Sequence, residues 1–457
     1  MVDFQSVAAI IFIIILTFII YAKRKKLDTK HFLNDFFNFS MYKTTWGLRM
    51  MDSAAKRYRK LVIVIGYLGV VIGFLGMVFI GFLLVVNVFD LFTKPDAVAG
   101  AGLVLPIRAK GVFFVPFFYW IISIFIIAVV HEFSHGLIAR AHNIKVKSSG
   151  LAFVGSSFKG IGLSLIIFSM FIKLKASNFD LIAAFSSFEI LKFSTDFWLT
   201  VGIVLFLISA YKNFFVPIIP AAFVEPDEKS LIKQPYKQQL SVFAAGPFSN
   251  IIIAFLFLAV VSFALNPLVD GIVQPNGVKI TNYVEGQKFP AESAGIGIGE
   301  IIQQVDGIPT PYVKNLSDAL REKKPGETVK IKTDKSVYEI KLAKNPENQS
   351  LAYIGAYLEQ ETKIEDDVKA TYGEFLPNAL IWIYGLFIIL VILNLGIGLF
   401  NLVPIGPLDG GRMLQLPLVR YFGKEKGNKI WYYIGMVFLI IILINIASGF
   451  GLFNLFS

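Results

Sequence analysis

The sequence predicts an α-helical polytopic membrane protein with an inserted α+β domain, and three observations indicate this fold class. Of its 457 residues, 55% are hydrophobic and only 16% are charged, whereas soluble domains carry about 25% charged residues. Several apolar stretches approach or exceed the roughly 20 residues that a helix needs to cross a bilayer. One acidic stretch without a long apolar run interrupts them, and it forms the soluble part.

About six transmembrane helices are expected, or eight if two shorter apolar stretches also cross the membrane. The six are Val7–Ala22, Leu61–Phe92, Gly111–Leu137, Leu240–Leu265, Phe375–Phe400 and Trp431–Ile446. Two shorter apolar stretches, at 160–172 and 197–210, could form two further spans or a re-entrant pair. Either choice leaves the sidedness of the following segments unchanged. The positive charges follow the first apolar stretch and no small-residue cleavage site appears, so a retained anchor is expected instead of a signal peptide.

The charge distribution predicts which segments face the cytoplasm. The net charge is +11, and residues 23–60 hold 11 Lys/Arg against three Asp. A basic block between two apolar stretches is typical of a cytoplasmic loop that meets anionic lipid headgroups, so the lipid bilayer and not nucleic acid is the expected partner. This orientation puts residues 267–374 outside the cell membrane and the end of the third span near the cytoplasm. The absence of cysteine excludes disulfides and thiolate metal sites.

The acidic stretch, residues 267–374, is expected to fold as a soluble α+β domain. It holds 17 of the 32 Asp/Glu residues. The alternating segments TVKIKTD and VYEIKLA predict β-strands, and LSDALRE at 316–322 predicts a short helix.

The motif HEFSH lies at the end of an apolar span. Residues four apart share one face of a helix, so His131 and His135 can direct both imidazoles at one metal ion. The spacing is that of the HExxH motif, in which the histidines bind zinc and the intervening Glu132 acts as general base. The structural alternative is a hydrogen-bonded histidine pair with a salt-bridging glutamate, which an apolar span disfavours.

Such a site needs a third protein ligand, and Asp409 is the best candidate. It lies in FNLVPIGPLDGG, residues 400–411, whose prolines and glycines prevent a continuous helix directly after an apolar span. Irregular backbone at membrane depth is tolerated only where it is buried in protein or lines a wet cavity. The alternative for Asp409 is an N-cap of a helix that starts near Arg412. His142 is expected at the surface where the span ends, and His31 in the basic loop.

Together, HEFSH, AAGPFSN at 244–250, the inserted domain and NLVPIGPLDGG resemble the site-2 protease family of intramembrane zinc metalloproteases. The resemblance covers roughly residues 111–155 and 217–430, and AAFVEPDEKSL at 221–231 is similar to prokaryotic, archaeal members. It implies one catalytic Zn²⁺ bound by His131, His135 and Asp409, with Glu132 as the catalytic residue. It also implies that Asn250 and Asn401 line the cleft and contact the substrate backbone, although close helix packing explains the Gly246/Asn250 pair equally well.

Within the acidic stretch, FPAESAGIGIGEIIQQVDGIPT at 289–310 resembles PDZ domains of bacterial type. Such domains add a peptide as an extra strand, and YIGAYL at 353–358 could supply the loop that holds its carboxylate. The alternatives are that the domain only blocks bulky substrates, or binds nothing.

The expected organisation has seven parts. They are an N-terminal transmembrane anchor (1–22), a basic cytoplasmic loop (23–60), a transmembrane region with the HExxH helix (61–155), an apolar insertion (156–216), a transmembrane region with the GPFSN motif (217–266), the extracytoplasmic PDZ-like domain (267–374) and a C-terminal transmembrane region with the LDG motif (375–457). The insertion departs from the family pattern, and a lid, a substrate gate and a partner-binding element are all compatible with it.

The resulting functional hypothesis is a multi-pass membrane protein that hydrolyses peptide bonds in or near transmembrane segments of substrate proteins, as in regulated intramembrane proteolysis. Its active site lies towards the cytoplasmic side. One alternative is a catalytically silent scaffold whose PDZ-like domain binds peptides and whose metal is structural. Zinc transport is a third, which the single HExxH motif and the PDZ-like insert disfavour.

Overall fold

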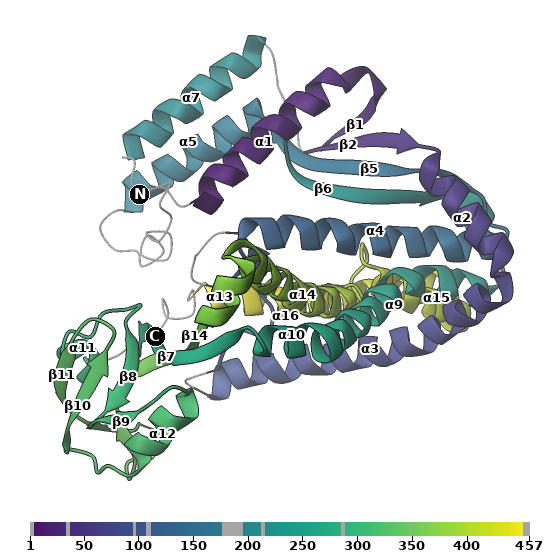
Figure 1. Cartoon of the computed structure of the whole chain (residues 1–457). Helices are drawn as coiled ribbons and strands as arrows, with labels where there is room; N and C mark the ends of the chain where they lie inside the picture. The colour runs from purple at the N-terminus through teal and green to yellow at the C-terminus, as the bar shows by residue number, and fades with distance from the viewer. Residues whose placement is uncertain are drawn as a thin grey trace. The chain divides into compact units, whose positions relative to one another are not determined.

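The structure is a computed structural model of the 457-residue chain, and it describes residues 4–32, 37–94, 97–106, 111–175, 195–211, 215–284, 288–346 and 348–450. The chain forms two compact units. The first comprises Met1–Ala259 and Gly385–Ser457, and the second comprises Val260–Tyr384. Figure 1 labels most of the elements of both.

The first unit is mostly helical. Its elements, including two helices that continue into the second unit, are α1 (Phe4–Ala22), β1 (Leu27–Phe32), β2 (Phe37–Thr44), α2 (Trp46–Arg57), α3 (Arg59–Thr93), β3 (Leu103–Leu105), β4 (Val112–Phe114), α4 (Phe117–Ala141), β5 (Val146–Ser157), α5 (Phe158–Lys175), α7 (Thr195–Tyr211), β6 (Phe215–Pro226), α8 (Glu228–Ile232), α9 (Tyr236–Val260), α14 (Phe375–Phe400), α15 (Asp409–Phe422) and α16 (Lys424–Gly449).

Five helices in the described part of the chain are long and apolar enough to cross a membrane. They are Arg59–Thr93, Phe117–Ala141, Tyr236–Asp270, Phe375–Phe400 and Lys424–Gly449. The remaining predicted span, Val7–Ala22, lies in α1, where the apolar helix Ala9–Ala22 is shorter than these five. The predicted third span starts too early, because Val112–Phe114 is a short strand and the helix begins only after Pro116. The predicted fold class, a polytopic α-helical membrane protein, is confirmed.

Three glycines of helix α3 each pack against a different helix. Gly66 lies against Ile138 of α4, Gly69 against Phe248 of α9, and Gly73 against Met413 of α15. Because a glycine has no side chain, the backbones approach closely, and dispersion contacts hold helices together in lipid. Helix α3 thereby joins the three helices that carry the sequence motifs.

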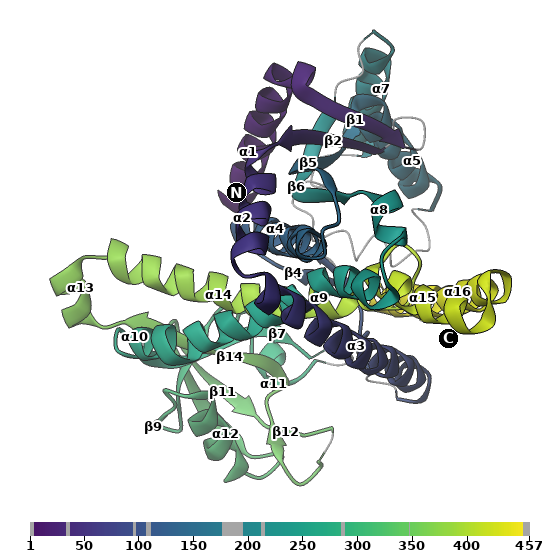
Figure 2. The ribbon, with the colours of Figure 1, turned by 90° about the vertical axis from the view of Figure 1, so that its right-hand side faces the viewer.

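A four-stranded antiparallel sheet covers α4. The strand order is β1-β2-β5-β6, so β6 is an edge strand. Figures 1 and 2 show β5 and β6 running along α4. The basic segment 23–60 was expected as a loop. It instead contains β1, β2 and α2, because residues 38–44 pair with residues 149–155 more than a hundred positions later.

The apolar insertion 156–216 joins the central strand β5 of this sheet to its edge strand β6. Its helices α5 and α7 pack against each other, with Gly162 against the backbone of Gly202 (Figure 1). Residues 176–194, between these helices, lie outside the described residues. This helix pair is compatible with both expected arrangements, and whether it spans the membrane or re-enters it stays a prediction.

The second unit is an α+β domain with its own core. Its elements are α10 (Asn266–Asp270), β7 (Val273–Tyr283), α11 (Pro290–Ser293), β8 (Ile301–Val305), β9 (Ile308–Pro309), α12 (Val313–Arg321), β10 (Thr328–Thr333), β11 (Val337–Lys341), β12 (Ala343–Lys344), β13 (Ala352–Tyr353), β14 (Ala356–Ile364) and α13 (Asp366–Tyr372). The sheet order is β11-β10-β8-β7-β14, which leaves β14 at one edge. Strands β10 and β11 and helix α12 confirm the three elements expected from the sequence.

The glycine contacts of α3 generate a stability prediction. A leucine at Gly69 has to displace the Phe248 ring, and overpacking of this kind costs about 1–3 kcal/mol. We therefore expect Gly69→Leu to lower the thermal unfolding midpoint of the detergent-solubilised chain. Gly396→Leu is the matched control, because Gly396 is exposed on α14 and a side chain there meets nothing within 4 Å. Equal unfolding midpoints for the two variants would show that the close contact of Gly69 with Phe248 contributes nothing to the stability of the chain.

Candidate metal centre

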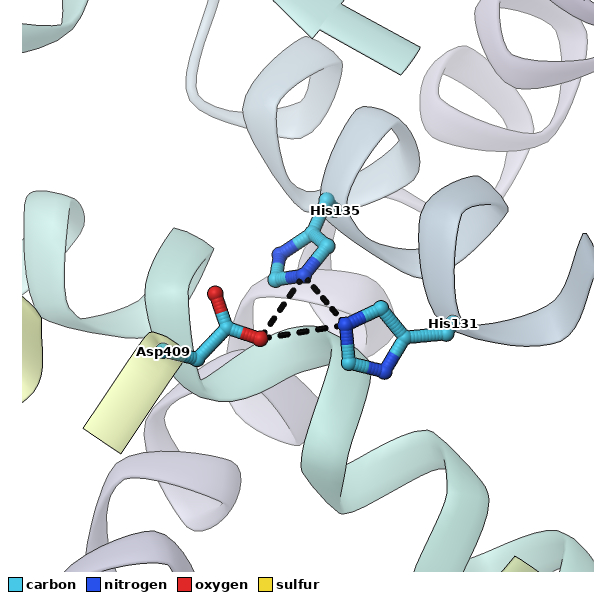
Figure 3. Close-up of side chains that lie close together, drawn as sticks. All are labelled: His131, His135 and Asp409. Atoms are coloured by element: carbon cyan, nitrogen blue, oxygen red, sulfur yellow. Dashed lines mark hydrogen bonds and ion pairs between the residues drawn. The ribbon is translucent and has the colours of Figure 1, made fainter. Parts of the chain in front are cut away.

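Two histidines of α4 form the first half of the site. His131 and His135 lie one helical turn apart, and their Nε2 atoms are 3.1 Å from each other. Figure 3 shows both rings directed at the same point. Because the two residues share a helix face, the spacing in the sequence is sufficient to produce this half of the site.

Asp409 forms the second half from another part of the chain. It is the first residue of α15, and Leu408 is the N-cap. The N-cap alternative for Asp409 is therefore wrong, and the helix begins three residues before the expected start. Gly410 donates its backbone N–H to the carbonyl of Asn401 over 2.8 Å. A Cβ at Gly410 would overlap the Leu402 carbonyl, so only glycine permits the tight loop that points Asp409 at the histidines.

The three ligand atoms have the separations of a tetrahedral metal site. The Asp409 Oδ2 atom lies 3.0 Å from His131 Nε2 and 3.3 Å from His135 Nε2 (Figure 3). Zinc bonds of about 2.0–2.2 Å at the tetrahedral angle place neighbouring ligand atoms about 3.3 Å apart. All three side chains are mostly buried. Two imidazoles and one carboxylate are donors that zinc accepts, so the residues fit the ion that the resemblance implies.

Gly246 of α9 leaves the space in which a metal ion can lie. A Cβ at this position would fall against the Nε2 atoms of both His131 and His135. Any other residue would therefore fill the volume between the ligands. The glycine of the AAGPFSN motif thus has a role at the site in addition to helix packing.

The second ring nitrogen of each histidine has a partner on α9. The Nδ1 atom of His135 lies 2.6 Å from the carbonyl oxygen of Val242, which can only accept a hydrogen bond. His135 therefore carries its proton on Nδ1, and its Nε2 lone pair is free for a metal. The Nδ1 atom of His131 lies 3.2 Å from the side-chain amide of Asn250.

Glu132 faces a cavity of about 560 Å³ next to the ligands. Its carboxylate accepts a hydrogen bond from the backbone N–H of Val224 on β6, over 3.0 Å. Asn401 also lines the cavity, and its contact with a substrate stays a prediction. Asn250 is fully buried and is not among the lining residues.

Charged side chains surround the cavity away from the ligands. Lys147, Glu225, Glu228 and Arg412 all line it. Lys147 also forms an ion pair of 3.0 Å with Asp227, which lowers the pKa of that carboxyl and raises the pKa of the lysine. This pair joins β5 to the N-cap of α8 and so fixes one wall of the cavity.

Of the other two histidines only His142 has a described side chain, and it is not part of the ligand cluster. His142, expected at the surface, is buried, and its Nε2 atom lies 2.9 Å from the Ser241 hydroxyl. Packing of α4 against α9 removes it from solvent, which its polar neighbours in the sequence did not indicate. The side chain of His31 lies outside the described residues.

Comparison with known proteins identifies the family. The model of peptidase family M50 matches residues 119–442, which is more than half of the chain. The chain belongs to peptidase family M50. This match confirms the resemblance to the site-2 proteases, and this M50 member is a multi-pass membrane protein.

Several curated relatives are similar to this M50 chain. It is 26% identical over 295 residues to the zinc metalloprotease RasP of Shouchella clausii, covering 53% of this chain and 68% of the relative. It is 24% identical over 277 residues to the regulator of sigma-W protease RasP of Bacillus subtilis, covering 51% and 64%. An uncharacterized protein of the archaeon Methanocaldococcus jannaschii is 25% identical over 411 residues, covering 89% and 84%.

A solved PDZ domain is also similar in sequence. The PDZ domain of the SdrC-like protein from Listeria monocytogenes is 25% identical, covers 20% of this chain and 90% of its own length, and has a TM-score of 0.15. A TM-score this low carries no argument about the fold.

The sequence did not indicate three contacts of the site. The carbonyl of Val242 lies next to His135, and the backbone N–H of Val224 binds Glu132. Gly246 lies against both histidines because it has no side chain. Backbone contacts leave no residue type to search for. The only available signal was the glycine of AAGPFSN, which helix packing accounted for as well.

The position of Gly246 generates a prediction about metal binding. In Gly246→Ala the new methyl group occupies the space between the two Nε2 atoms, so we expect the purified chain to lose its bound metal while it remains folded. Metal content by elemental analysis checks this, with Gly396→Ala as a control substitution far from any neighbour. A full metal complement in Gly246→Ala would contradict the proposed position of the ion.

Proposed function

We propose that this M50 member is an intramembrane zinc metalloprotease that hydrolyses peptide bonds within or near the transmembrane segments of other membrane proteins. The observation that carries the proposal is the convergence of Asp409 with His131 and His135 beside a cavity that Glu132 also faces. The names of two relatives, both RasP proteases and one of them a zinc metalloprotease, support the reaction class and the metal.

The site residues divide the chemistry among them. His131, His135 and Asp409 would hold zinc. As a Lewis acid, the ion would lower the pKa of water and polarise the scissile carbonyl. Glu132, one residue after a ligand and open to the cavity, takes a proton from the attacking water and delivers it to the leaving amine.

The substrate has to be extended where it is cut, because a helix shields its carbonyls in its own hydrogen bonds. Two groups beside the ligands favour an extended chain. Asn401 lines the cavity and carries an amide that can bind a peptide backbone, and β6 is an edge strand that borders the same cavity. An edge strand pairs readily with an added strand. Release of a cytosolic fragment, and capture of a peptide by the inserted domain, stay predictions.

Glu132→Gln tests the proposed reaction. The amide keeps the size of the side chain but cannot accept a proton, and general acid–base catalysis contributes about a hundredfold to ten-thousandfold. We therefore expect cleavage of a transmembrane reporter by the full chain in proteoliposomes to fall by that factor. Zinc content should be unchanged, because Glu132 is not a ligand.

Glu228→Gln is the control for this test. Glu228 lines the same cavity from α8 and is exposed, so the change removes a nearby carboxylate without touching the ligands. We expect cleavage within about threefold of the wild type. Undiminished cleavage by Glu132→Gln would favour the alternative, a scaffold with a structural metal.

We further propose that the basic segment 23–60 faces the cytoplasm and that the inserted domain lies outside. Since the chain contains no cysteine, labelling of a single introduced cysteine reports only the side of the membrane on which that position lies. We expect a membrane-impermeant maleimide to label Lys335→Cys, in the exposed β10–β11 turn, on intact cells. Ser53→Cys, on the exposed face of α2, should react only after permeabilisation. Labelling of both positions from the same side would refute this orientation.

A further inference from the structure

We propose that Asn250 is a positioning residue of the metal centre: its side-chain oxygen accepts the Nδ1–H of His131 and so presents Nε2 to the ion. This inference rests on the proposed function, because it assumes that His131 binds zinc. It assigns Asn250 to the back of a ligand and not to the substrate.

The location of Asn250 supports this role. Its relative exposure is 0%, and it does not line the cavity. Its side-chain amide lies 3.2 Å from His131 Nδ1, on the opposite side of the ring from Asp409. A residue with no access to the cavity cannot contact a substrate there, but it can fix the ring of a ligand.

The chemistry of the imidazole determines which amide atom has to face the ring. The Nε2 atom of His131 is the one near Asp409 and His135, so the metal takes that lone pair. A neutral imidazole then carries its hydrogen on Nδ1, which becomes a donor. The asparagine must therefore present its oxygen, as the Val242 carbonyl does for His135.

A half-turn of the amide group brings the oxygen into place. In the structure the nitrogen of Asn250 faces His131, while its Oδ1 atom is buried and has no hydrogen-bond partner among the described residues. Rotation about the last side-chain bond exchanges the two atoms without breaking a bond of the oxygen. A buried acceptor without a partner is costly, so the donor on His131 favours the rotated form.

Gly246 and Asn250 then have linked roles. They lie four residues apart on one face of α9, and this face contacts both histidines. Gly246 leaves the space for the ion, and Asn250 holds the ring behind it. A single contact between α9 and α4 therefore explains both Gly246 and Asn250 of the GPFSN segment.

The test measures zinc affinity of the purified full-length chain by competition with a chelator. Removal of a partner behind a ligand typically weakens metal binding about 10–100-fold, so we expect that loss in Asn250→Leu. In Asn250→Asp the carboxylate still accepts from Nδ1–H, so affinity should stay within a few-fold of wild type.

Asn394→Leu is the matched control, because Asn394 is fully buried in α14 and its Oδ1 atom also has no partner in the described chain. It should bind zinc as wild type does.

A role in packing alone predicts the opposite order of variants. If Asn250 only fills space, Asn250→Asp should destabilise the chain more than Asn250→Ala, because the buried carboxylate would have no hydrogen-bond donor. The proposal instead requires Asn250→Asp to bind zinc at least tenfold more tightly than Asn250→Ala. This comparison remains informative if Asn250→Leu fails to fold. Equal affinities for Asp and Ala, or equal losses in the Asn250 and Asn394 leucine variants, would overturn the proposal. A wild-type chain that binds no zinc would instead contradict the proposed function itself.

Discussion

The approach of Asp409 to His131 and His135 is the constraint on which the first unit depends. A carboxylate and two imidazoles lie within 3.0–3.3 Å of one another in a bundle of apolar helices. Groups of this kind are costly at membrane depth unless they neutralise one another or bind a cation. The tight loop before α15 and the glycines of α3 can be understood from this requirement, because they let α15 approach α4 and α9 closely enough.

The sequence was informative wherever function required a particular side chain at a local spacing. His131 and His135 could be predicted together because four residues span one helical turn, and their apolar surroundings disfavoured a purely structural histidine pair. Asp409 was harder to find, since nearly three hundred residues separate it from the histidines. It was identified because it is a carboxylate in a glycine- and proline-rich loop directly after a membrane span. The long membrane helices and two strands of the inserted domain, β10 and β11, followed from apolar length and alternation.

The parts that could not be predicted depend on long-range pairing or on the backbone. Strand β2 lies in a segment whose charge indicated only a lipid-facing loop, and it becomes a strand by pairing with β5. The burial of His142 likewise results from packing against Ser241 of α9. The hydrogen bond from Val224 to Glu132 uses an N–H that every residue except proline has, so nothing in the local sequence marks it.

Each reactive side chain of HEFSH is held by a different partner outside α4. The Val242 carbonyl holds His135, the Asn250 amide contacts His131, and β6 binds Glu132. A helix alone fixes the direction of these side chains but leaves the rings free to rotate. Helix α9 lies behind the two ligands, while β6 contacts the glutamate from the cavity side, so the contacts that hold the ligands are separate from the contact that holds Glu132. A site arranged in this way can admit a substrate beside Glu132 without disturbing the ligand geometry.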